Sequence, residues 1–81
     1  VDLFVGNAGI WPDDDIPIAL MADGHWAQTL RANLDSVFFC VREAARRMPD
    51  GGRVVLVSST AGQRGEAFHA DYAASKGAII S

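Results

Sequence analysis

The chain has 81 residues, of which 49% are hydrophobic and 21% charged, and its formal net charge is −3. This composition excludes a disordered chain, and the acidic balance does not favour nucleic acid or an anionic membrane surface as a partner. The single cysteine, Cys40, excludes an internal disulfide, and no apolar run is long enough to span a bilayer.

The first predicted element is a buried β-strand, because Val1 to Val5 is short, mostly apolar and β-branched at both ends. The small residues Gly6-Asn7-Ala8-Gly9 interrupt it. Residues 10–21 are expected to form a loop, since they contain two prolines and a run of three aspartates. The aspartates lack the glycine and the spaced ligands of a calcium site, so we interpret them as a solvated acidic loop.

A long amphipathic helix is predicted from about Asp23 to Met48, where apolar residues recur every three or four positions. Pro49 and the glycines that follow it end the helix. From Val37 to Val41 the helix is apolar on every side. Its second apolar face therefore needs a partner, such as a neighbouring subunit, unless the helix is buried entirely within one large domain.

A second strand is predicted at 53–57, followed by a loop at 60–70 and a helix from about Asp71. The order strand, helix, strand, helix, with a long crossover, indicates a parallel βαβ unit. The predicted class is α/β, as a partial Rossmann-type doubly wound parallel sheet (a βαβα fragment). Two parallel strands do not make a stable sheet by themselves, so we interpret the chain as an internal fragment of a longer one.

A reaction site is predicted around Tyr72 and Lys76, whose spacing places them on one face of a helix. The phenol can give or take a proton, and the lysine sets a positive charge beside it. Ser59 follows the second strand and offers a hydroxyl that can hold a substrate oxygen. Because ligands of open parallel sheets bind beyond the carboxyl ends of the strands, Ser59 and the turn at residues 7–9 are expected near the same site.

Several other positions are ambiguous when each is taken alone. Asn7-Ala8-Gly9 fits a simple tight turn as well as a cofactor site, and Asn33, in mid-helix, fits a solvated side chain. Ile10 and Trp11 follow the turn and are expected to wall a substrate pocket.

The cluster of His69, Glu66 and Asp71 also has more than one interpretation. Their side chains are of types that bind metals, but ordinary loop polarity is the simpler explanation. A third possibility is that His69 touches the substrate, since it lies between Ser59 and Tyr72 in the sequence.

Taken together, these motifs resemble the middle of a short-chain dehydrogenase/reductase, of the 3-oxoacyl-acyl-carrier-protein-reductase-like type. The segments that match this single-domain Rossmann family are, in order, Asn7-Ala8-Gly9, Asn33-Leu34, Ser59 with Ala61-Gly62, and Tyr72-x-x-x-Lys76. One departure is Gly6, where the family often has a second asparagine. The resemblance implies that residues 1–81 are the central part of a single NAD(P)-binding Rossmann domain, truncated at both ends.

The resemblance also implies a role for each matching residue. Tyr72 would be the general acid/base, and Lys76 would stabilise its phenolate and hold the nicotinamide ribose. Ser59 would position and polarise the substrate oxygen, and Asn33 would hold a water of the proton relay. The cofactor, NAD or NADP, would be held by Asn7, Ala8, Gly9, Tyr72 and Lys76.

The implied activity is the NAD(P)-dependent interconversion of an alcohol and a ketone or aldehyde by hydride transfer. The alternatives are a non-catalytic binding or regulatory protein on the same fold, and a sugar-nucleotide epimerase or dehydratase of the extended type. The fragment alone is expected to be inactive. An exposed Tyr–Lys pair favours the phenolate by only about 0.2–0.5 kcal/mol, whereas a charge about 5 Å away in an occluded site favours it by about 3 kcal/mol. The fragment lacks the parts of the sheet that would occlude the site.

We further expect a cytoplasmic protein whose partner is a small-molecule alcohol or carbonyl substrate, with no nucleic acid, membrane or metal. A homo-oligomer is expected, as a dimer or homotetramer, through the helices at 23–48 and 71–81.

Overall fold

The computed structural model describes residues 2–7 and 9–81, which form an elongated body of 46 × 23 × 18 Å. In chain order its elements are β1 (Leu3–Gly6), η1 (Ile18–Leu20), α1 (Asp23–Leu30), η2 (Arg31–Asp35), α2 (Ser36–Arg47), β2 (Arg53–Leu56), α3 (Thr60–Arg64) and α4 (Ala70–Ile80). Of the two elements labelled η, η1 is a single 3₁₀ turn and η2 is π-helical.

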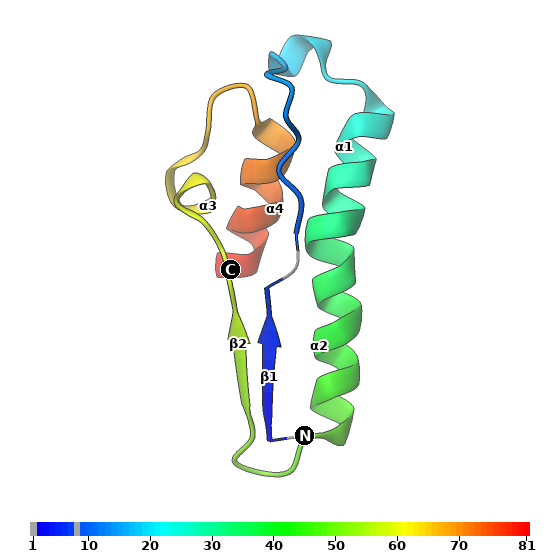
Figure 1. Ribbon diagram of the computed structural model, residues 1–81, viewed down its shortest axis with the longest axis vertical. Helices are drawn as coiled ribbons and strands as arrows, with labels where there is room; N and C mark the ends of the chain where they lie inside the picture. Colours follow the sequence, from blue (N-terminus) through cyan, green and yellow to red (C-terminus); the bar gives the residue numbers. More distant parts are fainter. Residues whose placement is uncertain (1, 8) are drawn as a thin grey trace.

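The two strands pair in parallel, with Leu3 opposite Arg53 and Gly6 opposite Leu56. The predicted βαβα order and the partial Rossmann-type sheet are therefore confirmed. Both strands lie within a residue or two of their predicted bounds, although Val1 lies outside the described residues. Their carboxyl ends meet at one edge of the sheet, from which the segment before α1 and the chain leading to α3 continue (Figure 1).

The long helix predicted at 23–48 is confirmed in extent, because α1, η2 and α2 follow one another without a break from Asp23 to Arg47 (Figure 1). The π-helical segment in its middle was not predicted by the apolar periodicity. Such wide turns inside α-helices are frequent at functional sites, and this one carries Asn33. The helix α2, after this segment, packs against β1. The helix α1, before it, packs against α4, and η2 itself also contacts α4.

The prediction of a loop at 60–70 is wrong for its first half, which forms α3. Its N-terminus is capped by Ser59, whose Oγ accepts a hydrogen bond from the Ala61 N–H at 3.0 Å. Its C-terminus ends at Gly65, where φ is 82°, a left-handed conformation that favours glycine. A serine cap and a terminal glycine are sequence signals for a helix, but the helix between them is too short to show periodicity. The predicted loop at 10–21 likewise contains the single turn η1.

The described residues bury mainly polar side chains. Ala61 is the one hydrophobic residue among them that is fully buried. The polar ones are Thr29, Asn33, His69, Asp71, Ser75 and Lys76. The strands, in contrast, leave large apolar side chains uncovered, for example Val5 at 53% exposure and Val55 at 49%. Parallel sheets are normally covered on both faces, so most of the apolar surface of this sheet remains without a packing partner.

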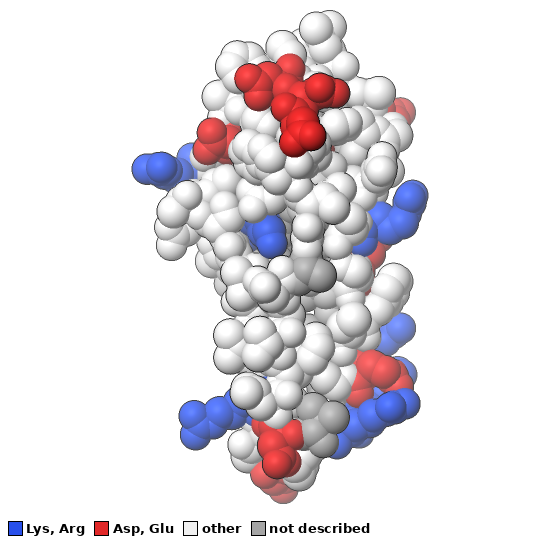
Figure 2. Space-filling view, viewed as in Figure 1, with Lys and Arg blue, Asp and Glu red and all other residues white. Residues whose placement is uncertain are grey.

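Charged side chains are unevenly distributed over the surface. Acidic side chains gather near the top of the face seen in Figure 2, over the segment between β1 and α1. The aspartates at 13–15 belong to this segment and all three are exposed, as expected for a solvated acidic loop.

We expect the isolated 81-residue chain to lose its structure gradually rather than in one cooperative transition. The chain buries so little apolar surface that this burial cannot offset the conformational entropy lost on folding. Far-UV circular dichroism during a urea titration checks this, with sedimentation velocity as the control for self-association through the uncovered apolar faces. A sharp sigmoidal transition of the monomer would contradict it.

Candidate active site

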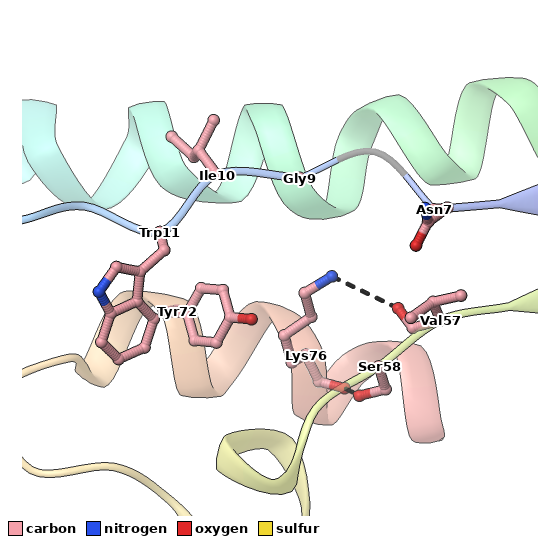
Figure 3. A pocket seen from close by; sticks show the side chains of 8 residues that line it. All are labelled: Asn7, Gly9, Ile10, Trp11, Val57, Ser58, Tyr72 and Lys76. Atoms are coloured by element: carbon pink, nitrogen blue, oxygen red, sulfur yellow. Dashed lines mark hydrogen bonds between the residues drawn. The ribbon is translucent and has the colours of Figure 1, made fainter.

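A cavity of about 230 Å³ opens at the carboxyl ends of the two strands, between the segment that follows β1, the end of β2 and helix α4 (Figure 3). It is lined by Asn7, Gly9, Ile10, Trp11, Val57, Ser58, Tyr72 and Lys76. This position is the one where ligands bind in open parallel α/β sheets. Ile10 and Trp11 line the cavity, which confirms their predicted place in a pocket wall. Ala8, predicted to contact the cofactor, lies outside the described residues.

Tyr72 and Lys76 enter the cavity from successive turns of α4. The Tyr72 hydroxyl is directed toward Lys76 (Figure 3), and the Lys76 Nζ lies 5.9 Å from the centroid of the Tyr72 ring. Lys76 is only 6% exposed, and its ammonium group donates a hydrogen bond to the carbonyl oxygen of Val57 at 3.3 Å. A buried ammonium group is costly unless it is partnered. The end of β2 therefore holds the charge close to the phenol.

The backbone of α4 is set by its contact with α3 at Gly62. A methyl group on Gly62 would come within 2.6 Å of the carbonyl carbon of Lys76 and 2.7 Å of its oxygen. Only glycine permits this approach of the two helices. Beside it, the Ser58 Oγ donates a hydrogen bond of 2.6 Å to the same Lys76 carbonyl oxygen. These contacts hold the Lys76 backbone against α3 and the end of β2, and they thereby set where the Lys76 side chain lies.

Asn33 is completely buried, so the interpretation of its side chain as solvated is wrong. Its Oδ1 accepts a hydrogen bond from the Ile10 N–H at 2.6 Å, and its Nδ2 donates to the Ile10 carbonyl at 2.8 Å. The same Nδ2 donates to the Ser75 Oγ at 3.3 Å. Asn33 therefore joins η2, the wall of the cavity and α4.

Ser59 is half-buried and does not line the cavity, whereas its neighbour Ser58 does. The two hydroxyl groups differ in their hydrogen bonds. Ser58 gives its only hydrogen to the Lys76 carbonyl, while the Ser59 oxygen accepts from the Ala61 N–H and keeps its own hydrogen available to donate.

Asp71 forms a buried polar cluster that sequence reasoning did not identify. Its carboxylate is 1% exposed, accepts a hydrogen bond from the Thr29 hydroxyl, and lies 3.0 Å from the His25 Nε2. Simple loop polarity is therefore wrong for Asp71. The spacing of His25 and Thr29 on one helix face was the available signal, but nothing in the sequence pairs that face with residue 71.

His69 is also buried, at 6% exposure, so loop polarity is wrong for it as well, whereas Glu66 is exposed. His69 does not line the cavity, and its ring stacks on Trp11 instead. Among residues 2–7 and 9–81, no group of three or more histidine, cysteine or acidic side chains is arranged to hold a metal ion. None of the described helices combines the length and apolar composition needed to cross a bilayer.

Gly9 gives a direct test of whether a nicotinamide cofactor fits this site. A methyl group on Gly9 would lie 3.1 Å from the Asn33 Oδ1 and 3.3 Å from the Lys76 Nζ, so a side chain would fill the space in front of the amine. Within the described part of the chain, the Lys76 ammonium group makes one hydrogen bond of the three it can donate. The glycine backbone and the remaining donors suit a flat, hydroxylated ligand such as a nicotinamide ribose.

Comparison with known proteins decides the family. A sequence model of the family described as short chain dehydrogenase matches residues 1–81. The chain belongs to the short-chain dehydrogenase family. It is 45% identical over 80 residues to a 3beta-hydroxysteroid dehydrogenase of Mediterraneibacter gnavus, which covers 98% of this chain and 29% of the relative. It is 35% identical over 82 residues to a 3-oxoacyl-acyl-carrier-protein reductase of Escherichia coli, a match that covers 99% of this chain and 33% of the relative. The family predicted from the motifs is thus confirmed.

Solved structures of the family agree with the fold. A short-chain dehydrogenase/reductase (SDR:Glucose/ribitol dehydrogenase) from Brucella melitensis matches with a TM-score of 0.87 at 35% identity, over 99% of this chain and 33% of the other. A short chain dehydrogenase from Mycobacterium smegmatis matches with a TM-score of 0.87 at 31% identity, over 99% of this chain and 34% of the other. The chain spans about a third of the length of these relatives. The variants described below are therefore to be made in the full polypeptide that the gene encodes, called the parent protein.

Replacing Asn33 by Ala is expected to lower the free energy of unfolding of the parent protein by about 1–3 kcal/mol, because it removes two hydrogen bonds to the Ile10 backbone and one to the buried Ser75 hydroxyl. Urea denaturation measures the loss. The matched control is Gln28→Ala on an exposed position of α1, which should change stability by less than about 0.5 kcal/mol. Equal effects of the two variants would contradict the structural role of Asn33.

Proposed function

We propose that the chain is the central part of a single NAD(P)-binding Rossmann domain, and that the parent protein interconverts an alcohol and a ketone or aldehyde. The observation that carries this proposal is the Tyr72 hydroxyl directed toward the buried Lys76 amine, in a cavity at the strand ends. A nicotinamide, NAD or NADP, supplies or accepts the hydride when it is bound. The two relatives described above are named for reactions on hydroxyl and oxo groups, which supports the same chemistry here.

Tyr72 acts as the general acid/base. It gives its phenolic proton to the substrate oxygen during reduction and takes it back during oxidation. The Lys76 Nζ lies 5.9 Å from the centroid of the Tyr72 ring, and in general a charge about 5 Å from an opposite charge contributes about 3 kcal/mol at an effective dielectric constant near 20. An exposed pair on a helix contributes only about 0.2–0.5 kcal/mol, so the burial of Lys76 supports this role.

The remaining residues hold the cofactor and orient the substrate. Asn7 and Gly9 line the surface against which the cofactor lies, Ala8 is assigned to the cofactor contact with them, and Lys76 donates to the ribose hydroxyls. Asn33 supports that surface with its side chain, whose amide is already bonded to Ile10 and Ser75, so it holds a water of the proton relay through its backbone. Ser59 donates the hydrogen of its hydroxyl to the substrate oxygen, since its own oxygen is already engaged by the Ala61 N–H.

The parent protein is proposed to be a homo-oligomer that associates through the helices at 23–48 and 71–81. The support is an apolar face of α2 on which Phe38 is 55% exposed and Phe39 54% exposed.

The Tyr72→Phe variant of the parent protein tests the assignment of the acid/base. Its kcat for alcohol oxidation should fall by about 10²–10⁴-fold, the contribution of a positioned proton-transfer group. Cofactor binding, measured by nicotinamide fluorescence, should change little, because the ring stays in place. Turnover close to that of the wild-type protein would refute the proposal.

A pair of serine variants tests which hydroxyl holds the substrate oxygen. Ser59→Ala should lower kcat/KM by about 10²-fold, as expected when a hydrogen-bond donor to a developing oxyanion is removed. Ser58→Ala removes a neutral hydrogen bond to the Lys76 carbonyl and should cost less than about tenfold. Steady-state kinetics on both variants gives the comparison, and the reverse order of effects would assign the role to Ser58.

A further inference from the structure

Trp11 forms a rigid aromatic wall beside the candidate acid/base. Its indole lies against the Tyr72 ring in an edge arrangement, with centroids 4.7 Å apart and planes at 81°. Figure 3 shows it alongside Tyr72, on the side away from Lys76. Although it contacts two other rings, Trp11 remains 48% exposed. The exposed part of the indole is thus available to a molecule that occupies the cavity.

His69 holds the indole from the other direction. The two rings stack with centroids 3.9 Å apart and planes at 18°. The imidazole is buried, and its Nδ1 lies 3.1 Å from the Ala67 carbonyl oxygen. A buried ring that stacks in parallel on the indole restricts the rotamers of Trp11. His69 itself does not line the cavity, so it can act on a ligand only through Trp11.

The backbone around His69 reinforces this arrangement. Phe68 has a φ of 63°, a left-handed conformation that residues other than glycine rarely adopt. The turn leaves Phe68 52% exposed while the next side chain, His69, is buried. The Ile16 N–H donates to the Phe68 carbonyl at 3.1 Å, which ties the segment after Trp11 to the turn that carries His69.

We propose that Trp11 is the specificity-determining wall of the substrate site, that His69 is a positioning residue which holds it, and that the preferred substrates are ketones or alcohols with a rigid alicyclic ring next to the reacting carbon. The proposal rests on the proposed function, because it takes Tyr72 as the group that meets the substrate oxygen. In this proposal, the substrate ring lies against the indole and extends along the Tyr72 ring, so that its carbonyl carbon reaches the Tyr72 hydroxyl.

A rigid ring fits this wall better than a flexible chain does. The indole offers a flat apolar surface in one fixed orientation, so a flat alicyclic face can cover it without losing internal rotations. An open acyl chain must give up rotamer freedom to make the same contact. The polar lining, Asn7, Ser58 and Lys76, lies toward the strand ends, which leaves Trp11 as the large apolar surface next to Tyr72.

The test compares 1-decalone, a rigid bicyclic ketone, with acetone as substrates of the parent protein. Trp11→Ala should lower the ratio of kcat/KM for decalone to that for acetone by about tenfold or more, the effect of losing the apolar contact of a large aromatic side chain. The matched control is Trp26→Ala. Trp26 is an indole on α1 that does not line the cavity, and its removal should leave the ratio unchanged.

Two variants of His69 separate positioning from folding. His69→Ala should lower the same ratio by about 2- to 10-fold, since an aromatic pair is lost. His69→Phe keeps a flat ring under the indole and should restore the wild-type ratio. If His69→Ala and His69→Phe lower the ratio equally, His69 does not act by holding Trp11.

Calorimetric titration with 1-decalone decides the assignment independently of turnover. Binding that weakens in Trp11→Ala but not in Trp26→Ala supports the wall. Equal binding by the wild-type protein and Trp11→Ala, or an unchanged ratio in the kinetic test, overturns it. A protein that binds decalone through Trp11 but turns over no alcohol or ketone would refute the proposed function and leave the wall standing.

Discussion

The hydrogen bonds of the Asn33 side chain are the constraint on which the rest of the site depends. A buried amide must find partners for its oxygen and its N–H groups, and Asn33 finds them in the Ile10 backbone and in Ser75. One side chain thereby fixes three segments that lie far apart in the sequence. The Ser75 Oγ continues the connection by donating to the Tyr72 carbonyl at 2.8 Å. The segment that follows β1 and the helix that carries Tyr72 thus share one support.

The second support is the contact of α3 with α4. Gly62 lets the two backbones touch at Lys76, and Asp71 attaches the first turn of α4 to α1 through Thr29 and His25. Between these contacts α4 has little freedom to shift or rotate. The position of α4 thus depends on buried, paired polar groups more than on the small apolar core. Such groups give a defined geometry when each has its partner.

How far the sequence predicted the structure depended on the range of the signal. The two strands and the helix at 23–48 were predicted because their apolar patterns are local and strong. The helix α3 was missed because five residues are too few to show a period, although its capping residues were present. The π-helical turn at 31–35 has no known local signal in this sequence. It carries Asn33, whose side chain is buried against a distant segment.

The candidate site divides in the same way. The sequence by itself determined that a phenol, an amine and a serine hydroxyl lie near the carboxyl ends of two parallel strands, because helical spacing and strand direction are set locally. Only the tertiary structure decided that Asn33, His69 and Asp71 are buried rather than solvated. It also decided that Trp11 stands between His69 and Tyr72. The physical reason is that burial and partnership are properties of residue pairs far apart in the chain, and no periodicity or spacing within one segment encodes which distant segment will cover it.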